Sequence, residues 1–211
     1  MKVPPPQPAS ARRPTRVHPD VEEVLVSRRA LARRVAELGR QISADYAGRE
    51  LLLVGVLRAA AVFLADLARA IDLPLCVDFL SAASYGPGTE SSGTVRIEHD
   101  LREPVAGRHV LVVDTVLDTG LTLQALDLAL RERGPASVRY VVLLQKVRGT
   151  PPLLTADYVG FTIPDRFVIG YGLDYAQHYR NLPYVGVLKG RVYAQKSTPV
   201  PIESIGPSGG V

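Results

Sequence analysis

The sequence predicts an α/β fold whose core is a mainly parallel, twisted sheet flanked by helices. Apolar runs of strand length alternate along the chain with stretches in which apolar residues recur at helical spacing. Such alternation is typical of strand–helix–strand units, which build parallel sheets. The chain has 211 residues, 46% of them hydrophobic, and can therefore bury one substantial core. We expect a single domain over residues 20–196.

The first half of this domain contains two strand–helix units. Residues 24–26 are an apolar run followed by Ser27, a candidate N-cap. The helix after Ser27 carries four apolar residues at helical spacing, which mark its buried face: Leu31, Val35, Leu38 and Ile42. Residues 51–56 form a second apolar run, and an alanine-rich helical stretch follows to about Ala70.

The second half continues the alternation. Residues 75–80 predict a strand, whereas residues 81–93 contain glycine, proline and serine without an apolar period and predict a long loop. Loops of this length are usually functional or disordered. A strand at residues 110–113, a helix through about Arg131 and a strand at residues 138–144 complete the pattern.

Both ends of the chain differ in composition from the domain. Residues 1–19 hold six prolines, which prevent regular hydrogen bonding and predict a disordered arm. Residues 197–211 are rich in proline, glycine and serine and predict a flexible tail. The arginine-containing start faintly resembles an organellar transit peptide, but its prolines disrupt the amphipathic helix that such peptides form. The role of the arm stays open.

Composition narrows the class of partner. The formal charge of +4 comes partly from the leading arm, and no basic stripe is interleaved with aromatic residues. We therefore expect phosphate-bearing small molecules rather than nucleic acid. No apolar run approaches the roughly 20 residues of a membrane-spanning helix, so we expect no membrane segment. The single cysteine, Cys76, cannot form an internal disulfide, which favours a reducing, cytoplasmic location.

The most informative stretch is residues 109–123, HVLVVDTVLDTGLTL, in which an apolar strand ends in Asp114 and continues through a short loop into a helix. The loop consists of Asp118, Thr119, Gly120, Leu121 and Thr122. Glycine permits close backbone approach, and the amides at a helix start point toward an anion, which together favour a phosphate monoester. A carboxylate at the carboxyl end of a strand can accept hydrogen bonds from sugar hydroxyls. Ordinary helix capping is the alternative interpretation.

This stretch closely resembles the signature by which type I phosphoribosyltransferases bind phosphoribosyl pyrophosphate (PRPP): an apolar strand, an acidic pair, two apolar residues, then Asp-Thr-Gly and Thr. The resemblance implies that residues 118–122 hold the 5-phosphate, that Asp114 contacts the ribose hydroxyls and that Asp118 accepts a proton near purine N7. Thr115 stands where the family usually has a second carboxylate, so one ribose or magnesium contact is weakened or replaced. A threonine hydroxyl can still hydrogen-bond there.

Residues 157–182, DYVGFTIPDRFVIGYGLDYAQHYRNL, resemble hypoxanthine-guanine phosphoribosyltransferases in particular. The resemblance implies that Phe167 stacks on the purine ring, that the backbone of Val168 contacts the base edge and that Lys146 contacts the exocyclic 6-oxygen. A lysine donates to a 6-oxo group but disfavours the 6-amino group of adenine. Taken singly, Phe167 would be a core aromatic and Lys146 a solvated charge. Their joint occurrence at family spacing favours a base site.

The same resemblance assigns the pyrophosphate and metal contacts. Asp174 would hold a magnesium ion through water, and Arg180 would contact pyrophosphate. The sequence Leu57, Arg58 and Ala59 resembles the family's Leu-Lys-Gly pyrophosphate loop, with the positive charge retained. The peptide between Leu57 and Arg58 corresponds to one that family members can hold in the cis form. A surface salt bridge is the alternative interpretation of Asp174 and Arg180.

The resemblance covers residues 24–189 and also implies a lid, a hood and a reaction. Ser84 and Tyr85, in the predicted loop, resemble the Ser-Tyr pair of a lid that excludes water from the reacting centre. N- and C-terminal segments would build a small hood on the sheet. Mg²⁺ would be the cofactor of a homodimer or homotetramer that converts PRPP and hypoxanthine or guanine into IMP or GMP and pyrophosphate.

Two alternatives stay open. A PRPP-sensing regulator on the same fold would bind RNA or DNA and need no base pocket, which Phe167, Lys146 and Asp174 argue against. An enzyme that prefers xanthine would differ in its contacts to the 2-position, near Val168 and Asp174. The sequence leaves the ranking of hypoxanthine, guanine and xanthine undecided, as it does the consequence of Thr115.

Overall fold

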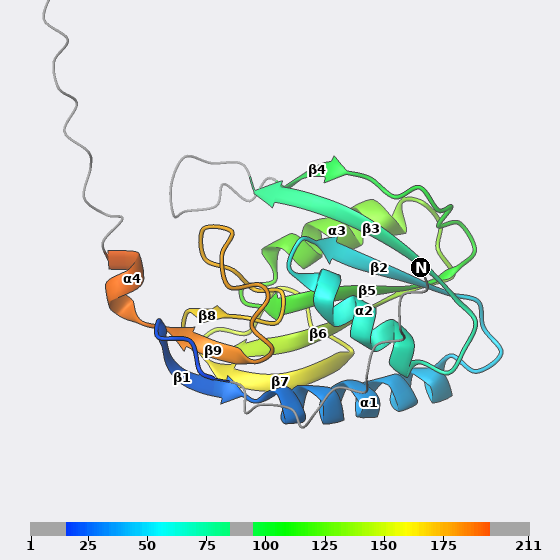
Figure 1. Ribbon diagram of the computed structural model, residues 1–211. Coiled ribbons are helices and arrows are strands. Elements are labelled where there is room, and N and C mark those ends of the chain that lie inside the picture. The colour runs from blue at the N-terminus through cyan, green and yellow to red at the C-terminus, as the bar shows by residue number, and fades with distance from the viewer. Residues whose placement is uncertain (1–15, 85–94, 195–211) are drawn as a thin grey trace, which may run out of the picture.

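The computed structural model describes residues 16–84 and 95–194, in which helices and a large sheet form layers beside a small second sheet (Figure 1). Residues 1–15 of the predicted arm and all of the predicted tail lie outside this part of the chain. Among the described residues, no helix is both long and apolar enough to span a membrane.

The main sheet has six strands in the order β4-β3-β2-β5-β6-β7. The strands are β2 (Leu51–Leu57), β3 (Leu75–Ser84), β4 (Val95–His99), β5 (His109–Leu117), β6 (Ser137–Val147) and β7 (Tyr158–Pro164). Every neighbouring pair is parallel except β3 and β4, which run antiparallel. The predicted mainly parallel sheet is therefore confirmed, and the carboxyl ends of its parallel strands meet along one edge.

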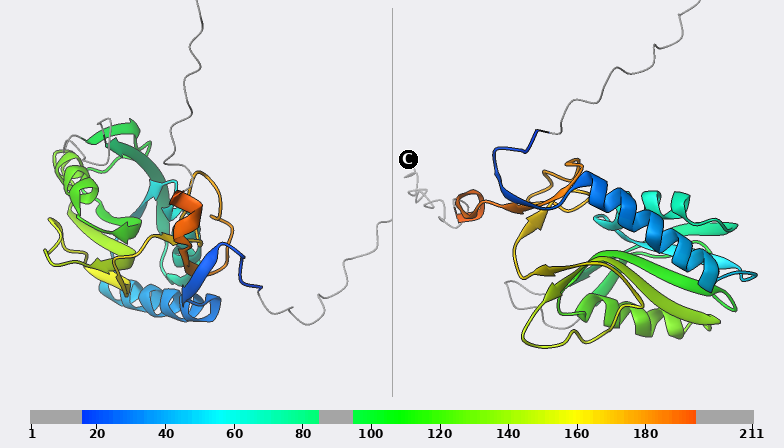
Figure 2. Two further views of the ribbon diagram at one scale, coloured as in Figure 1. Left: turned by 90° about the vertical axis from the view of Figure 1, so that its left-hand side faces the viewer. Right: turned by 90° about the horizontal axis from the view of Figure 1, so that it is seen from below.

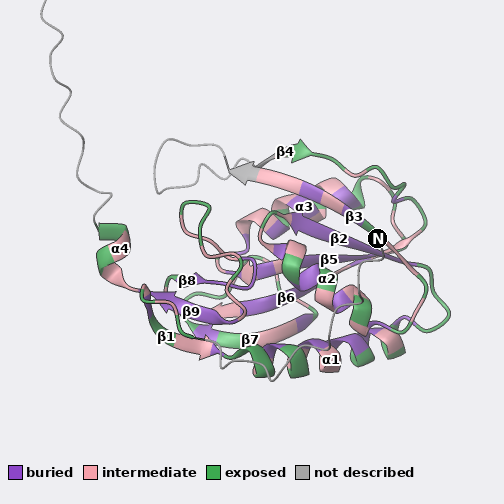
Figure 3. Ribbon diagram, viewed as in Figure 1, coloured by how far each residue is buried: buried purple, intermediate pink, exposed green. Residues whose placement is uncertain are grey.

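Helices cover both faces of this sheet (Figure 2). They are α1 (Arg28–Asp45), α2 (Ala60–Ala70) and α3 (Leu121–Arg131). In β2, Leu51 and Leu53 pack in one core cluster with α1 and α2, whereas Leu52 and Val54 pack in another with α3. Side chains alternate between the two faces of a strand, so a strand covered on both sides is apolar throughout. Figure 3 shows the resulting buried layer along the central strands.

The start of α1 agrees with its sequence signals. The Ser27 hydroxyl accepts a hydrogen bond from the Ala30 amide at 3.3 Å, which confirms the predicted N-cap. The four apolar residues predicted for the inner face are all buried, namely Leu31, Val35, Leu38 and Ile42. Burial of this stripe in the core cluster beside α2 and β7, rather than helix propensity alone, stabilises α1.

A second sheet of three antiparallel strands forms the predicted hood. Its order is β1-β9-β8, with β1 at Val21–Val26, β8 at Val168–Ile169 and β9 at Val185–Leu188, and α4 (Gly190–Ala194) follows. The strand predicted at residues 24–26 begins earlier, at Val21, because its first residues pair with β9. In Figure 1 the hood lies on the side toward which β2 and β5 point. The N- and C-terminal parts of the chain thus meet beside the carboxyl edge of the main sheet.

The start of the loop predicted at residues 81–93 is wrong. β3 continues to Ser84 and pairs with β4, a strand that the sequence pattern does not predict, with Ser81 opposite His99. The small side chains at this end of β3 give no apolar alternation, so the strand depends on a ladder to β4 that the pattern does not reveal. Of the predicted lid pair, Ser84 is described only as backbone of β3, and Tyr85 lies outside the described residues.

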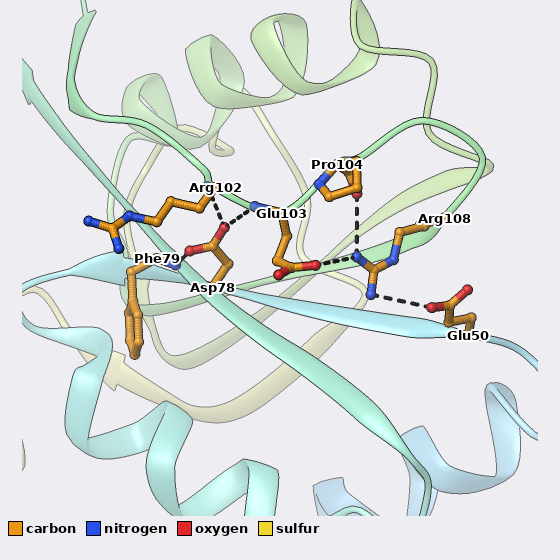
Figure 4. A network of polar contacts seen from close by, with 7 residues as sticks. All are labelled: Glu50, Asp78, Phe79, Arg102, Glu103, Pro104 and Arg108. Atoms are coloured by element: carbon orange, nitrogen blue, oxygen red, sulfur yellow. Dashed lines mark hydrogen bonds and ion pairs between the residues drawn. The ribbon is translucent and has the colours of Figure 1, made fainter.

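A carboxylate in β3, that of Asp78, accepts backbone hydrogen bonds from the segment that follows β4 (Figure 4). Asp78 is 9% exposed, and its Oδ2 accepts hydrogen bonds from the amides of Arg102 and Glu103 at 2.7 and 2.8 Å. Its Oδ1 accepts from the Phe79 amide at 2.8 Å. Burial acts to raise the pKa of Asp78, but the three amide hydrogen bonds outweigh burial, so that the pKa is lowered.

Candidate active site

The loop between β5 and α3 forms a small pocket where the sequence predicts phosphate binding. A cavity of about 80 Å³ is lined by Asp114, Val116, Leu117, Asp118, Thr119, Gly120, Leu121, Thr122 and Leu123. Gly120 has a φ of 82° directly before α3, and a Cβ there would lie 3.0 Å from the amide nitrogens of Leu153 and Leu154. Glycine therefore meets both the backbone angle and the close packing. The first residues of α3 line this cavity, and the amides at a helix start are free to bind an anion.

Asp114 and Thr115 are neighbours in β5 with different surroundings. The Asp114 carboxylate borders the cavity, and its Oδ1 accepts a hydrogen bond from the Thr115 amide at 2.6 Å. Burial raises the pKa of Asp114 to about 6, and this hydrogen bond partly offsets the rise. Thr115 is 1% exposed and does not line the cavity, and its hydroxyl has no hydrogen-bond partner among the described residues.

Four charged side chains, Asp118, Lys146, Arg148 and Asp165, form what we call the charge ring. Asp118 Oδ2 lies 3.2 Å from Lys146 Nζ, and Asp118 Oδ1 lies 2.8 Å from Arg148 Nε. Asp165 Oδ1 accepts a hydrogen bond from Lys146 Nζ at 2.9 Å, and Asp165 Oδ2 lies 2.9 Å from Arg148 Nη2. The hydrogen bond from Lys146, and the adjacent Arg148, lower the pKa of Asp165. Asp118 and Lys146, predicted for N7 and O6 of the base, are therefore paired with each other.

Arg148 and Asp165 are members of this ring that the sequence does not predict. In a strand, residues two apart face the same way, and Lys146 and Arg148 lie on either side of Val147, which is 60% exposed. That spacing is a signal by which Arg148 could have been found. Asp165 follows Pro164, which pairs with Val147 across β7 and β6. Only the pairing of these strands brings its carboxylate to Lys146.

The loops after β2 and β8 bring the predicted pyrophosphate residues together. Arg58 Nη1 and Arg180 Nη2 both donate to Gln177 Oε1, at 3.2 and 3.1 Å. Arg180 Nη2 also lies 2.9 Å from Asp174 Oδ1, while Asp174 Oδ2 accepts from the Gln177 amide at 2.9 Å. The salt bridge considered as an alternative for Asp174 and Arg180 is thus present, but it belongs to a larger cluster. Gln177, a neutral residue without a motif of its own, joins the two arginines.

Glycine at position 172 allows these two loops to pack in direct backbone contact. Gly172 has a φ of 98°, and a Cβ there would overlap the carbonyl oxygen of Ala59. The Gly172 carbonyl accepts a hydrogen bond from Arg180 Nη1 at 2.8 Å. The peptide bond between Leu57 and Arg58 is cis. The structure therefore places Leu57, Arg58 and Ala59 beside Arg180.

The aromatic residue predicted for the base lies where the hood begins. Phe167 is 44% exposed and precedes β8, in which Val168 is buried. The centroid of its ring lies 5.7 Å from that of Tyr175, edge to face, and 5.7 Å from that of Tyr193 in α4. Exposure of this size contradicts the interpretation of Phe167 as a core aromatic. Part of the ring is available to a planar ligand.

The predicted residues gather along the carboxyl edge of the main sheet. β2 pairs with β5 and β5 with β6, all parallel, so the loops that follow these strands are neighbours along one edge. The first of these loops carries Arg58 and the second is the phosphate loop, while Lys146 lies near the end of β6 itself. Open α/β sheets bind ligands in this position.

Comparison with known proteins identifies the family. A model described as the phosphoribosyl transferase domain matches residues 23–176 of this chain. The hypoxanthine-guanine phosphoribosyltransferase of Bacillus subtilis is 47% identical over 174 residues, which are 82% of this chain and 97% of that protein. The chain belongs to the hypoxanthine-guanine phosphoribosyltransferase family. A crystal structure of a Staphylococcus aureus hypoxanthine phosphoribosyltransferase superposes with a TM-score of 0.80 at 43% identity, covering 82% of this chain and 95% of that one.

A further relative is longer than this phosphoribosyltransferase. The bifunctional protein TilS/HprT of Listeria innocua is 47% identical over 179 residues, which make up 85% of this chain but 28% of that protein. Together the similarities confirm the fold class and the family that the sequence predicts. The roles of individual residues stay predictions.

Proposed function

We propose that this phosphoribosyltransferase joins the anomeric carbon of PRPP to N9 of hypoxanthine or guanine, releasing pyrophosphate and forming IMP or GMP. The observation that carries the choice of base is the pair formed by Lys146 Nζ and Asp118 Oδ2, 3.2 Å apart. A 6-oxopurine presents an acceptor, O6, beside a donor, N7–H, and these match the lysine and the carboxylate in turn. Adenine presents a donating amino group in place of O6 and would oppose the lysine.

The hood would supply the remaining contacts to the base. Phe167 would stack on the purine ring, an interaction that contributes about 1–3 kcal/mol per base in other proteins. Its exposed ring beside Tyr175 and Tyr193 supports this role. The backbone of Val168, and that near Asp174, would contact the edge that carries the 2-position. These contacts decide between hypoxanthine, guanine and xanthine.

PRPP would lie along the carboxyl edge of the sheet. Its 5-phosphate would occupy the cavity at the start of α3, where backbone amides and the hydroxyls of Thr119 and Thr122 can donate to it. Asp114 would accept hydrogen bonds from the ribose hydroxyls, whereas Thr115, which is 1% exposed and does not line the cavity, would leave the contact of the family's second carboxylate unmade. Arg58 and Arg180, brought together by Gln177, would bind pyrophosphate.

Magnesium fits this site only together with the substrate. Among the residues that the structure describes, no three His, Cys, Asp or Glu side chains are grouped so as to hold a metal ion. Magnesium is usually held by one or two carboxylates with substrate phosphate oxygens and water. Both Asp174 oxygens are already hydrogen-bonded or paired, yet each keeps a lone pair for a metal-bound water. When bound, the ion would neutralise charge on the departing pyrophosphate.

The bond changes of the proposed reaction balance without a further reactant. The N9 lone pair forms the bond to C1′, and the bond from C1′ to pyrophosphate breaks, leaving its electron pair on pyrophosphate. The N7 proton passes to Asp118 Oδ2, the oxygen nearest Lys146, and proton transfer to a positioned group contributes about 10²- to 10⁴-fold in rate. The guanidinium groups of Arg58 and Arg180 stabilise the negative charge that develops on the leaving group.

We further propose that the protein is a cytoplasmic homodimer or homotetramer. The cytoplasmic location rests on Cys76, the single cysteine, which cannot form an internal disulfide. The oligomer rests on the resemblance to the family. Size-exclusion chromatography with light scattering tests the oligomer, because a monomer at working concentration would contradict it.

Turnover with four separate bases tests the proposed reaction. Nucleotide formation from PRPP and magnesium is measured with hypoxanthine, guanine, xanthine and adenine. We expect IMP and GMP as products and little reaction with adenine. Efficient turnover of xanthine alone would assign the protein to the xanthine-preferring alternative. Tight PRPP binding without turnover of any base would refute the enzyme and favour the PRPP-sensing regulator.

A further inference from the structure

We infer that Arg148 is a positioning residue, which keeps Asp118 anchored when a 6-oxopurine inserts between Asp118 and Lys146 and breaks their ion pair. The inference rests on the proposed function, because it presupposes that these two side chains bind the base. Arg148 itself touches neither the base nor PRPP in this arrangement. It acts through the two carboxylates of the charge ring.

The distances within the charge ring indicate where it opens. Three of its five contacts are 2.8 to 2.9 Å long, the hydrogen bond from Arg148 Nε to Asp165 Oδ2 is 3.1 Å, and the longest, between Lys146 Nζ and Asp118 Oδ2, is 3.2 Å. This longest contact joins the two atoms that the edge of a 6-oxopurine would engage. Opening the ring at this point exchanges one ion pair for two hydrogen bonds to the base, and leaves the four shorter contacts intact.

Arg148 is the residue that holds the opened ring together. Its Nε lies 2.8 Å from Asp118 Oδ1 and donates its hydrogen bond to Asp165 Oδ2 at 3.1 Å, and its Nη2 lies 2.9 Å from Asp165 Oδ2, so one guanidinium forms ion pairs with two carboxylates. Lys146 stays on Asp165 Oδ1. The result is an open chain from Asp118 through Arg148 and Asp165 to Lys146. Its two ends are the acceptor and the donor that the base requires.

Loss of Arg148 should therefore weaken base binding in particular. Without Arg148, the only positive charge of the ring that pairs with Asp118 is Lys146. Binding of the base breaks that ion pair. Asp118 also loses the contact that fixes its orientation. Partly exposed ion pairs are weak individually, so we expect the KM for hypoxanthine to rise by about three- to tenfold when both contacts of Arg148 are lost. Asp118 begins the phosphate loop, but the groups proposed to bind PRPP are backbone amides and the side chains of other residues, so the KM for PRPP should change less than about twofold.

Three variants test the inference by steady-state kinetics on the full chain. Arg148→Gln removes the charge, and Arg148→Lys restores a point charge without the planar fork and should recover part of the loss. Arg133→Gln is the control, because Arg133 pairs with both oxygens of Asp100 beyond the opposite end of α3 from the phosphate loop. The control should match the wild type in both KM values.

The outcomes separate the inference from the proposed function. A rise in the KM for hypoxanthine without a matching rise for PRPP, in a variant whose melting temperature stays within about 2 °C of the wild type, would support the inference. Wild-type turnover with an unchanged KM for hypoxanthine in Arg148→Gln would overturn it alone, as would an equal rise in both KM values. Absence of turnover in the wild type would overturn both.

Discussion

Replacing Asp114 with asparagine should stabilise the folded protein at neutral pH while weakening PRPP binding. Burial raises the pKa of this carboxyl from the ordinary 3.8 to about 6, so the folded protein holds an ionised carboxylate in an unfavourable place. A pKa difference of about two corresponds to roughly 3 kcal/mol above pH 6. Because the carboxylate borders a cavity and keeps some solvent contact, that value is an upper limit. We expect a gain of about 1–3 kcal/mol in the free energy of unfolding at pH 7.5.

The sign of the effect fixes its pH dependence. The folded pKa of Asp114 lies above the unfolded value, so the penalty is absent below about pH 4, grows toward pH 6 and is complete above it. Urea unfolding of wild type and Asp114→Asn at pH 4.5, 6 and 7.5 measures the difference. A variant less stable than the wild type at pH 7.5, or a gain that does not shrink toward pH 4.5, would refute the reasoning. The KM for PRPP should rise about tenfold, because a neutral amide is a weaker acceptor than a carboxylate.

Asp78→Asn is a matched control with the opposite sign. The folded pKa of Asp78 is lowered, so its ionised form contributes stability that is present above the unfolded value and is lost as the pH falls through the folded one. An asparagine amide cannot accept from the amides of Arg102 and Glu103 while its oxygen serves Phe79 (Figure 4). We expect a loss of about 2–4 kcal/mol at pH 7.5 that becomes smaller in acid, measured by the same urea unfolding.

Two further substitutions probe the backbone and the buried hydroxyl of the site. Gly172→Ala should raise the KM for PRPP at least about tenfold and lower stability by about 1–3 kcal/mol, because its Cβ overlaps the Ala59 carbonyl at a φ of 98°. The control is Gly134→Ala, whose φ is also positive but whose Cβ meets nothing within 4 Å, so a similar rise in KM there would contradict the packing argument. Thr115→Val should raise the free energy of unfolding by about 1 kcal/mol, because a methyl group replaces a buried hydroxyl that lacks a partner among the described residues. The KM for PRPP should stay unchanged in that variant, because Thr115 does not line the cavity, and a rise would contradict this placement.

The sequence predicts those helices and strands whose apolar residues recur at a regular spacing. The inner face of α1 and the strands β2, β3, β5 and β6 follow from spacing alone, because both faces of the sheet are covered, whereas the sequence pattern does not predict β7. The extension of β3 and the whole of β4 do not follow from spacing either, since small residues near Ser84 give no alternation and their order depends on cross-strand pairing. The short strands of the hood likewise form between segments far apart in the chain, Val21 to Val26 with Val185 to Leu188.

Some residues of the candidate site could also be predicted from the sequence, and others could not. The phosphate loop is contiguous, so residues 118–122 could be placed from the sequence and line one cavity in the structure. Arg148 and Asp165 come together only through the pairing of β6 with β7, and Gln177 joins two arginines without a charge or motif to mark it. Contacts that depend on how loops pack against each other produce no recognisable pattern in the local sequence. For that reason the partners of the predicted residues were harder to predict than the residues themselves.

The rate of IMP formation from PRPP and hypoxanthine by the wild type and by Asp118→Asn tests the central claim most directly. Asparagine keeps the size of the side chain but removes the group that accepts the N7 proton. We expect kcat to fall about 10²- to 10⁴-fold with magnesium present, while the KM for PRPP changes less than about fivefold. An asparagine variant that forms IMP within fivefold of the wild-type rate would contradict the role of Asp118 as proton acceptor.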